Sequence, residues 1–168
     1  MPTKILMGFA TRYGSTQEVA ETIATDLRSQ GFAVDVMPAK AVHSLDGYQA
    51  VVLGAPLYMF HWHKDVLTLL NRNRKILEKL PVAVFALGPF HNKEEELKSA
   101  REQLDKELAK LPWLRPLAVE TFVGKFDPDK LGFPFNLIGP MKQMPPSDER
   151  DWPAIHDWAN HLAEMLQQ

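Results

Sequence analysis

The chain has 168 residues, of which 45% are hydrophobic and 24% charged, with a formal net charge of −2 and no cysteine. This composition suits one globular domain that is long enough to bury a core. The lack of cysteine excludes disulfides, thiolate metal sites and cysteine nucleophiles, and the near-neutral charge argues against a nucleic-acid partner.

Short apolar runs alternate with helical periodicity from the N-terminus onward. The apolar runs predict strands buried on both faces, and apolar residues three or four positions apart predict helices. The first half is expected to contain strand 4–9, helix 15–30 terminated by Gly31, strand 32–37, strand 48–55 and helix 63–77. The residues Ser15 to Glu18 have the pattern of a capping box for the first helix.

The second half continues the same alternation. Its expected elements are strand 81–87, helix 93–111 capped by Asn92, strand 117–126 and helix 151–166 with Pro153 in its first turn. Five strand–helix alternations imply right-handed crossovers and a parallel sheet covered on both faces. We therefore expect one α/β domain over residues 1–168, in which 127–150 is an insertion longer than an ordinary connection.

The loop after the first strand is the strongest candidate for a ligand site. It places Gly14 directly before a helix N-terminus, where free amides and the helix dipole attract an anion. Gly14 lets the backbone approach a phosphate closely, and Thr11, Ser15 and Thr16 can donate hydroxyl hydrogen bonds. The Gly-x-Gly-x-x-Gly and Gly-Lys-Ser/Thr signatures are absent, which argues against the usual NAD and ATP sites. The alternative is a helix cap without a ligand.

This loop, Thr11-x-Tyr13-Gly14-Ser15-Thr16, resembles the phosphate loop of the flavodoxin family and lies where that family has it. The resemblance implies a flavodoxin-like three-layer α/β/α sandwich whose five-stranded parallel sheet has the order 2-1-3-4-5. It also implies the cofactor FMN, with the phosphate held by Thr11, Arg12, Tyr13, Gly14, Ser15 and Thr16.

In the flavodoxin family the flavin ring lies between the loops that follow strands three and four. The resemblance therefore implies ring contacts in the first of these loops from Ala55, Pro56, Leu57, Tyr58, Met59 and Phe60. In the second loop it implies contacts from Leu87, Gly88, Pro89, Phe90 and His91. The alternative for the aromatic residues is a structural role at the edge of the sheet.

No residue is identified as a catalytic acid or base. His61, His63 and His91 are the only side chains near the expected ring that change charge near neutral pH. His61 and His63 also raise the alternative of a metal site. A catalytic zinc ion normally has three protein ligands, so we expect no metal.

The inserted segment 127–150, followed by Asp151-Trp152-Pro153, resembles the menaquinone-dependent protoporphyrinogen oxidase group of flavodoxin-like proteins, although both ring loops depart from that enzyme. The resemblance implies an FMN-dependent oxidoreductase that passes electrons from a reduced organic substrate to a quinone. Lys130 and Lys142 of the insertion would lie near anionic headgroups at a lipid surface. Its apolar residues would contact substrate, quinone or lipid; they are Leu131, Phe133, Phe135, Leu137, Ile138 and Met141. A packing flap over the sheet is the alternative.

Two further functions stay open, namely a non-enzymatic electron carrier and a flavin-free interaction domain. The near-neutral charge and the carboxylate-free ring loops favour the enzyme, because carriers of this family tend to be strongly acidic. The start of the chain, Met1 to Ile5, has no signal-peptide pattern. We therefore expect a cytoplasmic protein, with peripheral membrane contact through 127–150. The expected partners are a small redox substrate or a quinone, and a second copy in a homodimer.

Overall fold

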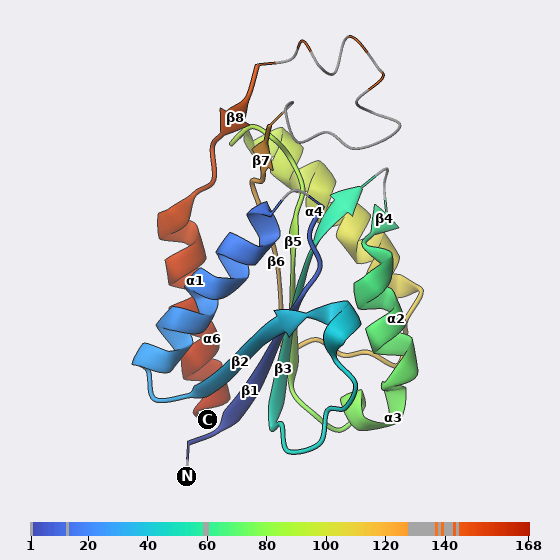
Figure 1. Ribbon diagram of the computed structural model, residues 1–168, viewed down its shortest axis with the longest axis vertical. Coiled ribbons are helices and arrows are strands. Elements are labelled where there is room, and N and C mark those ends of the chain that lie inside the picture. Colours follow the sequence, from blue (N-terminus) through green and yellow to red (C-terminus); the bar gives the residue numbers. More distant parts are fainter. Residues whose placement is uncertain are drawn as a thin grey trace.

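The computed structural model describes residues 2–12, 14–58, 61–127, 137, 139, 143 and 145–168, which form a three-layer α/β/α arrangement (Figure 1). The parallel strands of the central sheet are β1 (Lys4–Phe9), β2 (Ala33–Pro38), β3 (Ala50–Tyr58), β5 (Val82–Leu87) and β6 (Ala118–Phe122). Their order is β2-β1-β3-β5-β6. β4 (His61–Trp62) is an additional short strand that pairs antiparallel with β3. When the five parallel strands are counted without β4, their order is 2-1-3-4-5, and the predicted order is confirmed.

Helices cover both faces of the sheet (Figure 1). The first face carries α1 (Ser15–Ser29) and α6 (Trp152–Leu166), and its core includes Val19, Ile23 and Trp158. The second face carries α2 (Lys64–Arg72), α3 (Arg74–Leu77) and α4 (Glu94–Ala109), together with the short 3₁₀ helix η1 (Ala39–Ala41). Because the sheet is covered on both sides, β5 is buried at every position, as its unbroken apolar run predicts.

The strand register brings the carboxyl ends of the strands to one edge of the sheet. Phe9 pairs with Gly54, Gly54 pairs with Phe85, and Leu87 pairs with Phe122. The loops that follow β1, β3, β5 and β6 therefore leave the sheet at the same edge. In open parallel sheets this is where ligands bind.

Two of the predicted helices begin or end differently in the structure. The predicted helix 63–77 is divided at Asn73, whose side-chain amide donates to the Leu69 carbonyl oxygen at 2.8 Å and so competes with the helical backbone pattern. The predicted cap Asn92 lies outside α4, for which Lys93 is the N-cap residue. The backbone amide of Asn92 instead donates to Glu149.

The last predicted strand is also shorter than the apolar pattern suggests. β6 ends at Phe122, and β7 (Lys125–Phe126) pairs antiparallel with β8 (Ser147–Asp148) in a separate two-stranded sheet. The start of the last helix is as predicted, since Asp151 accepts a hydrogen bond from the Ala154 amide at 3.0 Å and Pro153 lies in the first turn.

Most of the insertion lies outside the described residues. Leu137 is described and is 72% exposed. The other residues predicted to contact substrate, quinone or lipid lie outside the described part of the chain; they are Lys130, Leu131, Phe133, Phe135, Ile138, Met141 and Lys142. Lipid or substrate contact through 127–150 therefore stays a prediction.

Candidate functional site

The loop between β1 and α1 leaves the helix N-terminus uncapped by any side chain. Gly14 is the N-cap residue, with φ at 90°, and α1 begins at Ser15. The capping box predicted from Ser15 to Glu18 is therefore wrong, because Gly14 takes the position that Ser15 would need. Thr11 accepts a hydrogen bond from the Gly14 amide at 2.8 Å, which holds the turn. The first amides of α1 consequently have no side-chain acceptor. Tyr13 lies outside the described residues.

Thr16 is the unusual residue of this loop. It is 1% exposed, and its hydroxyl has no hydrogen-bond partner among the described residues. A buried hydroxyl without a partner costs free energy, about 1–3 kcal/mol. Its position in the first turn of α1 suits an acceptor bound from outside the chain.

The loop after β3 turns back on itself to form β4. The indole of Trp62 is buried and donates to the Ala55 carbonyl oxygen at 3.1 Å, which ties the returning strand to the end of β3. Arg12 of the first loop lies over the ring of Tyr58, with its guanidinium carbon 3.7 Å from the ring centroid. Of the predicted ring contacts in this loop, Met59 and Phe60 lie outside the described residues.

A buried carboxylate on α4 holds β4 from the other side. Glu107 is 4% exposed and accepts hydrogen bonds from the Trp62 amide at 3.4 Å and from Lys110 at 2.8 Å. The Nδ1 atom of His61 lies 3.1 Å from the same carboxylate. Burial opposes ionisation of Glu107, but the hydrogen bonds from Lys110, His61 and Trp62 outweigh it and lower the pKa of the carboxyl. Sequence reasoning missed this residue, which resembles any other glutamate of an amphipathic helix.

The loop after β5 is held by the segment that follows β6. The Gly88 amide donates to the Phe122 carbonyl oxygen at 3.1 Å, and the Gly124 amide donates to the Pro89 carbonyl oxygen at 2.7 Å. Gly88 also packs so closely against α4 that a β-carbon would lie 2.7 Å from that of Ala100. Outside this close packing, the ring of Phe90 lies 5.0 Å from that of Phe126 and is 40% exposed.

A narrow cavity joins these three loops. It is lined by Arg12, Ser15, Thr16, Pro56, Leu57, Tyr58, Leu87, Gly88, Phe90, Gly124 and Lys125. Residues from the loops after β1, β3 and β5 thus meet in one cavity. The predicted site residues Thr11, Gly14, Ala55, Pro89 and His91 do not line it. Gly124 and Lys125 were not predicted, because the apolar pattern placed them inside a strand that in fact ends at Phe122.

His91 instead makes a contact away from this cavity. Its Nδ1 atom lies 2.6 Å from a Glu149 carboxylate oxygen, and the hydroxyl of Ser147 lies 3.5 Å from the Phe90 carbonyl oxygen. The pKa of Glu149 is lowered, first by the His91 hydrogen bond. The β5 loop is thus connected to the segment before α6.

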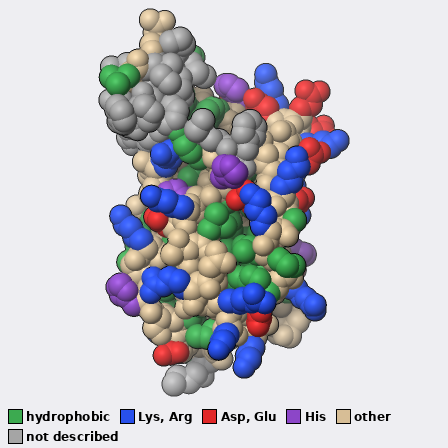
Figure 2. Space-filling model, turned by 90° about the vertical axis from the view of Figure 1, so that its right-hand side faces the viewer, with side chains coloured by type: hydrophobic (Ala, Val, Ile, Leu, Met, Phe, Trp, Pro, Cys, Tyr) green, Lys and Arg blue, Asp and Glu red, His purple; other side chains and the backbone are tan. Residues whose placement is uncertain are grey.

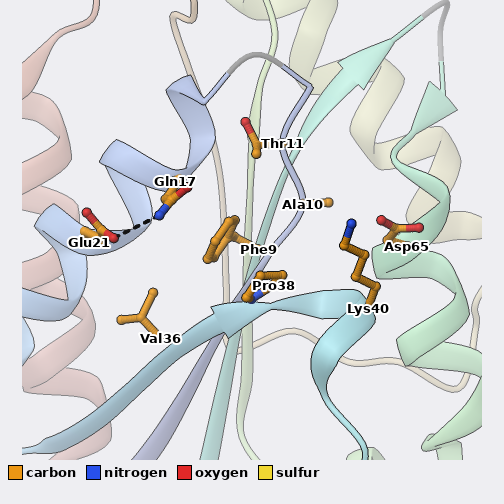
Figure 3. Close-up of a pocket in the computed structure, with 9 residues that line it drawn as sticks. All are labelled: Phe9, Ala10, Thr11, Gln17, Glu21, Val36, Pro38, Lys40 and Asp65. Carbon is orange, nitrogen blue, oxygen red and sulfur yellow. Dashed lines mark hydrogen bonds between the residues drawn. The ribbon is translucent and has the colours of Figure 1, made fainter.

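A second cavity, of about 280 Å³, lies beside the ends of β1 and β2 (Figure 3). Phe9, Val36 and Pro38 supply its apolar wall, and Thr11 lies at its edge. Lys40, Asp65 and Glu21 bring both signs of charge to it, and Glu21 already accepts a hydrogen bond from Gln17 at 3.2 Å. Its mixed charge favours no single class of ligand.

The donor set of the first cavity fits the phosphate group of a flavin mononucleotide. A dianion needs several hydrogen-bond donors and a positive charge. The uncapped N-terminus of α1, the buried Thr16 hydroxyl and the Arg12 guanidinium meet that requirement. The apolar remainder of the cavity lies between Leu57, Gly88 and Phe90. The whole cavity holds about 60 Å³, less than the roughly 300 Å³ of a typical cofactor site, so a ring that contacts these residues would extend beyond it.

Over the described ranges of the chain, no three histidine, cysteine, aspartate or glutamate residues are grouped so that they could hold a metal ion. Within the same ranges, no helix has the length and apolar character that crossing a membrane requires.

Comparison with known proteins gives a family and a fold. Residues 6–137 match the family model described as a flavodoxin domain. Protoporphyrinogen IX dehydrogenase (quinone) of Escherichia coli strain K12 is 27% identical over 95 residues, covering 55% of this chain and 52% of that protein. The chain therefore matches about half of the length of this curated relative.

Solved structures agree on the fold. An archaeal flavodoxin matches 99% of this chain and 100% of its own, with a TM-score of 0.61 and 12% identity. Rubredoxin oxygen:oxidoreductase of Desulfovibrio gigas matches 99% of this chain and 37% of its own, with a TM-score of 0.60 and 18% identity. These structures confirm the predicted flavodoxin-like sandwich.

Proposed function

This chain belongs to the flavodoxin domain family, and from that premise we propose that it binds FMN and acts as an oxidoreductase. The electrons would pass from a reduced organic substrate to a quinone. The main support for a bound FMN is the buried Thr16 hydroxyl. This hydroxyl has no hydrogen-bond partner among the described residues and lies in the first turn of α1, whose N-terminus no side chain caps. A phosphate oxygen would satisfy this hydroxyl and the neighbouring amides together.

Each loop has a distinct part in this proposal. Ser15 and Thr16 bind the phosphate through hydroxyl groups and backbone amides, and Arg12 supplies positive charge beside it. Leu57, Tyr58 and Phe90 enclose the ring and exclude water from it. Bound FMN supplies the electron and hydride transfer, and the protein supplies position and electrostatics.

Two observations favour an enzyme over an electron carrier. The relative from Escherichia coli is by name a dehydrogenase of protoporphyrinogen IX that uses a quinone. The ring loops of the present chain, 55–63 and 87–92, contain no carboxylate that would steer a basic partner protein toward the flavin. Porphyrinogen oxidation is therefore the first activity to test.

The cofactor is tested by the visible spectrum of the purified protein. We expect a yellow protein that releases FMN on heating, and an apoprotein that regains the flavin spectrum when FMN is added. Colourless protein that fails to take up added FMN would contradict both the enzyme and the carrier, and would leave the flavin-free interaction domain.

The activity is tested by anaerobic incubation of the FMN-loaded protein with protoporphyrinogen and menaquinone. An enzyme gives many turnovers per flavin, with one quinol formed for each electron pair removed from the porphyrinogen. A carrier accepts electrons once and then stops until a protein partner is supplied. The matched control is the apoprotein, which should leave the uncatalysed rate unchanged.

The insertion is proposed to contact the substrate or a lipid surface. The test deletes residues Leu131 to Met144 from the full chain and measures quinone turnover and binding to anionic lipid vesicles. Loss of either property, with the flavin spectrum retained, would support the proposal. If the deletion variant retains both quinone turnover and vesicle binding, the insertion acts only as a packing flap over the sheet.

A further inference from the structure

A third cavity, of about 320 Å³, opens directly beside the proposed flavin site. Its lining residues are Arg12, Tyr58, His61, Trp62, His63 and Lys64, which we call the basic pocket. Arg12 and Tyr58 line both this pocket and the narrow flavin cavity. A molecule in the basic pocket would therefore lie next to the flavin.

The basic pocket concentrates positive charge on a chain whose formal net charge is −2. No carboxylate is among its lining residues. Two carboxylates contact lining residues from outside the pocket. Glu107 accepts hydrogen bonds from His61, Trp62 and Lys110. Asp65 lies 3.9 Å from the His63 ring nitrogen. Figure 2 shows the face of α2 and α4, where Lys, Arg and His side chains are distributed over the surface.

Arg12 is the cation best placed to meet a ligand. Its guanidinium carbon lies over the Tyr58 ring, 3.7 Å from the ring centroid, a contact that favours one placement of the cation. Over the described part of the chain, no carboxylate forms an ion pair with Arg12. Arg12 therefore lies between the two cavities, and its positive charge acts on an anion in either of them.

His63 lies among several charged side chains. Burial lowers the pKa of its imidazole. Asp65 raises that pKa, whereas the nearby cations Arg12, Lys64 and Lys40 lower it further. His63, which is partly exposed, thus lies within reach of three cations and one carboxylate. An organic anion bound there would be stabilised by the same cations.

We propose that the basic pocket binds the anionic group of the organic molecule that exchanges electrons with the flavin. The ligand class is an organic anion that bears a carboxylate or sulfonate on an apolar ring system, with Lys64 as its own cationic contact. Arg12 is a cation that it shares with the flavin phosphate, and the Tyr58 side is its apolar contact. This inference rests on the proposed function, because a molecule in the basic pocket can exchange electrons with the protein only if a flavin occupies the neighbouring cavity. The basic pocket would then select molecules that carry a negative charge.

The test compares an anionic with a neutral quinone on the same FMN-loaded full chain. The flavin is first photoreduced without oxygen, and its reoxidation is followed by stopped flow with 1,4-naphthoquinone-2-sulfonate or with 1,4-naphthoquinone. In each case two electrons and two protons leave the reduced flavin, and the quinone becomes the quinol. The variant is Lys64→Glu, because Lys64 lines only the basic pocket and not the flavin cavity. A glutamate is well tolerated in the first turn of α2.

We expect Lys64→Glu to lower the second-order rate constant for the sulfonated quinone about tenfold, and to leave that for the neutral quinone within about twofold. Lys64→Arg should restore the wild-type ratio. The matched control is Lys75→Glu on α3, an exposed lysine at the opposite end of the molecule from β4 (Figure 1). It makes the same charge change and should leave the ratio unaltered.

The outcomes separate the two proposals. If both quinones react with the wild type and the variant lowers neither rate or both rates equally, the basic pocket does not select anions and this inference is wrong. If Lys75→Glu has the same effect as Lys64→Glu, overall charge is responsible and the inference is also wrong. If the wild type takes up no FMN, the proposed function itself fails.

Discussion

Gly54 of β3 lies so close to Phe85 of β5 that a β-carbon on Gly54 would come within 1.9 Å of the Cζ atom of that ring. The two residues are partners in the parallel register of β3 and β5. The Phe85 ring also packs against Phe122 at 6.0 Å and Trp158 at 5.9 Å, between ring centroids. Gly54 therefore makes room for the aromatic cluster that joins the sheet to α6.

The first prediction concerns this contact. Gly54→Ala should lower the free energy of unfolding by about 1–3 kcal/mol, because the extra methyl group forces Phe85 off its position in a packed core. Urea denaturation measures the change. The matched control is Gly124→Ala, where the added β-carbon would lie at an ordinary 3.7 Å from Leu87. Equal stability of both variants would mean that the Phe85 ring can move aside without cost.

The second prediction concerns the phosphate. Replacing both Ser15 and Thr16 by alanine removes two hydroxyl donors beside the N-terminus of α1. Each lost hydrogen bond to a charged phosphate costs about 1.5–3 kcal/mol, so the loss of two should raise the dissociation constant for FMN at least about a hundredfold. Fluorescence titration of the apoprotein with FMN measures it. Thr25→Ala, an exposed position later in the same helix, is the control. Unchanged affinity in the double variant would place the phosphate elsewhere.

The third prediction concerns Glu107, which holds β4 through the Trp62 amide and His61. Glu107→Gln keeps the shape but removes the charge, and should cost about 1–3 kcal/mol of unfolding free energy at neutral pH. The lowered pKa of Glu107 means that the folded state favours the ionised form. This stabilisation is complete above the unfolded pKa and is lost as the pH falls through the folded value.

Urea denaturation of wild type and Glu107→Gln at neutral and at acidic pH measures this dependence. The difference between the two proteins should shrink on acidification, because the wild-type carboxyl becomes protonated. Glu102→Gln, an exchange of the same type on the same helix, is the control. A difference that stays constant down to acidic pH would contradict a role for the Glu107 charge.

The fourth prediction concerns Tyr48, whose hydroxyl donates to Asp35 at 2.7 Å. Burial, together with the hydrogen bond and the charge of Asp35, raises the pKa of Tyr48 to about 12. The folded pKa thus exceeds the unfolded value of about 10. The stabilisation is present in full below pH 10 and is lost as the pH rises toward 12.

Tyrosinate absorbance measures this titration directly. In the folded wild type one of the three tyrosines should ionise late, and Tyr48→Phe should remove that late component. The variant should also show a weaker loss of stability between neutral and strongly alkaline pH. If the late component persists in Tyr48→Phe, it belongs to another tyrosine.

The sheet was predictable because its signals are local. The unbroken apolar run of β5 and the helical spacing of Val19, Ile23 and Leu27 each occur within a few residues. Their alternation predicts a parallel sheet covered on both faces. The order of its strands was predicted from the resemblance to the flavodoxin family and is confirmed as β2-β1-β3-β5-β6. The boundaries were less predictable. The predicted helix 63–77 is interrupted by one side-chain bond from Asn73 to the backbone, which periodicity cannot detect.

By itself the sequence determined the layers and the loop that precedes α1, since these follow from hydrophobic periodicity and from the position of Gly14 before a helix. The sheet order was predicted from the resemblance to the flavodoxin family. Only the tertiary structure decided which of the loop residues meet. It brought Gly124 and Lys125 to the cavity and turned His91 toward Glu149. It also placed Glu107 behind β4, 45 residues along the chain from Trp62. The physical reason is that burial and partnership depend on residues distant in sequence. Residues that are close in the sequence therefore determine the helices and strands, whereas the packing of those helices and strands determines which residues form the site.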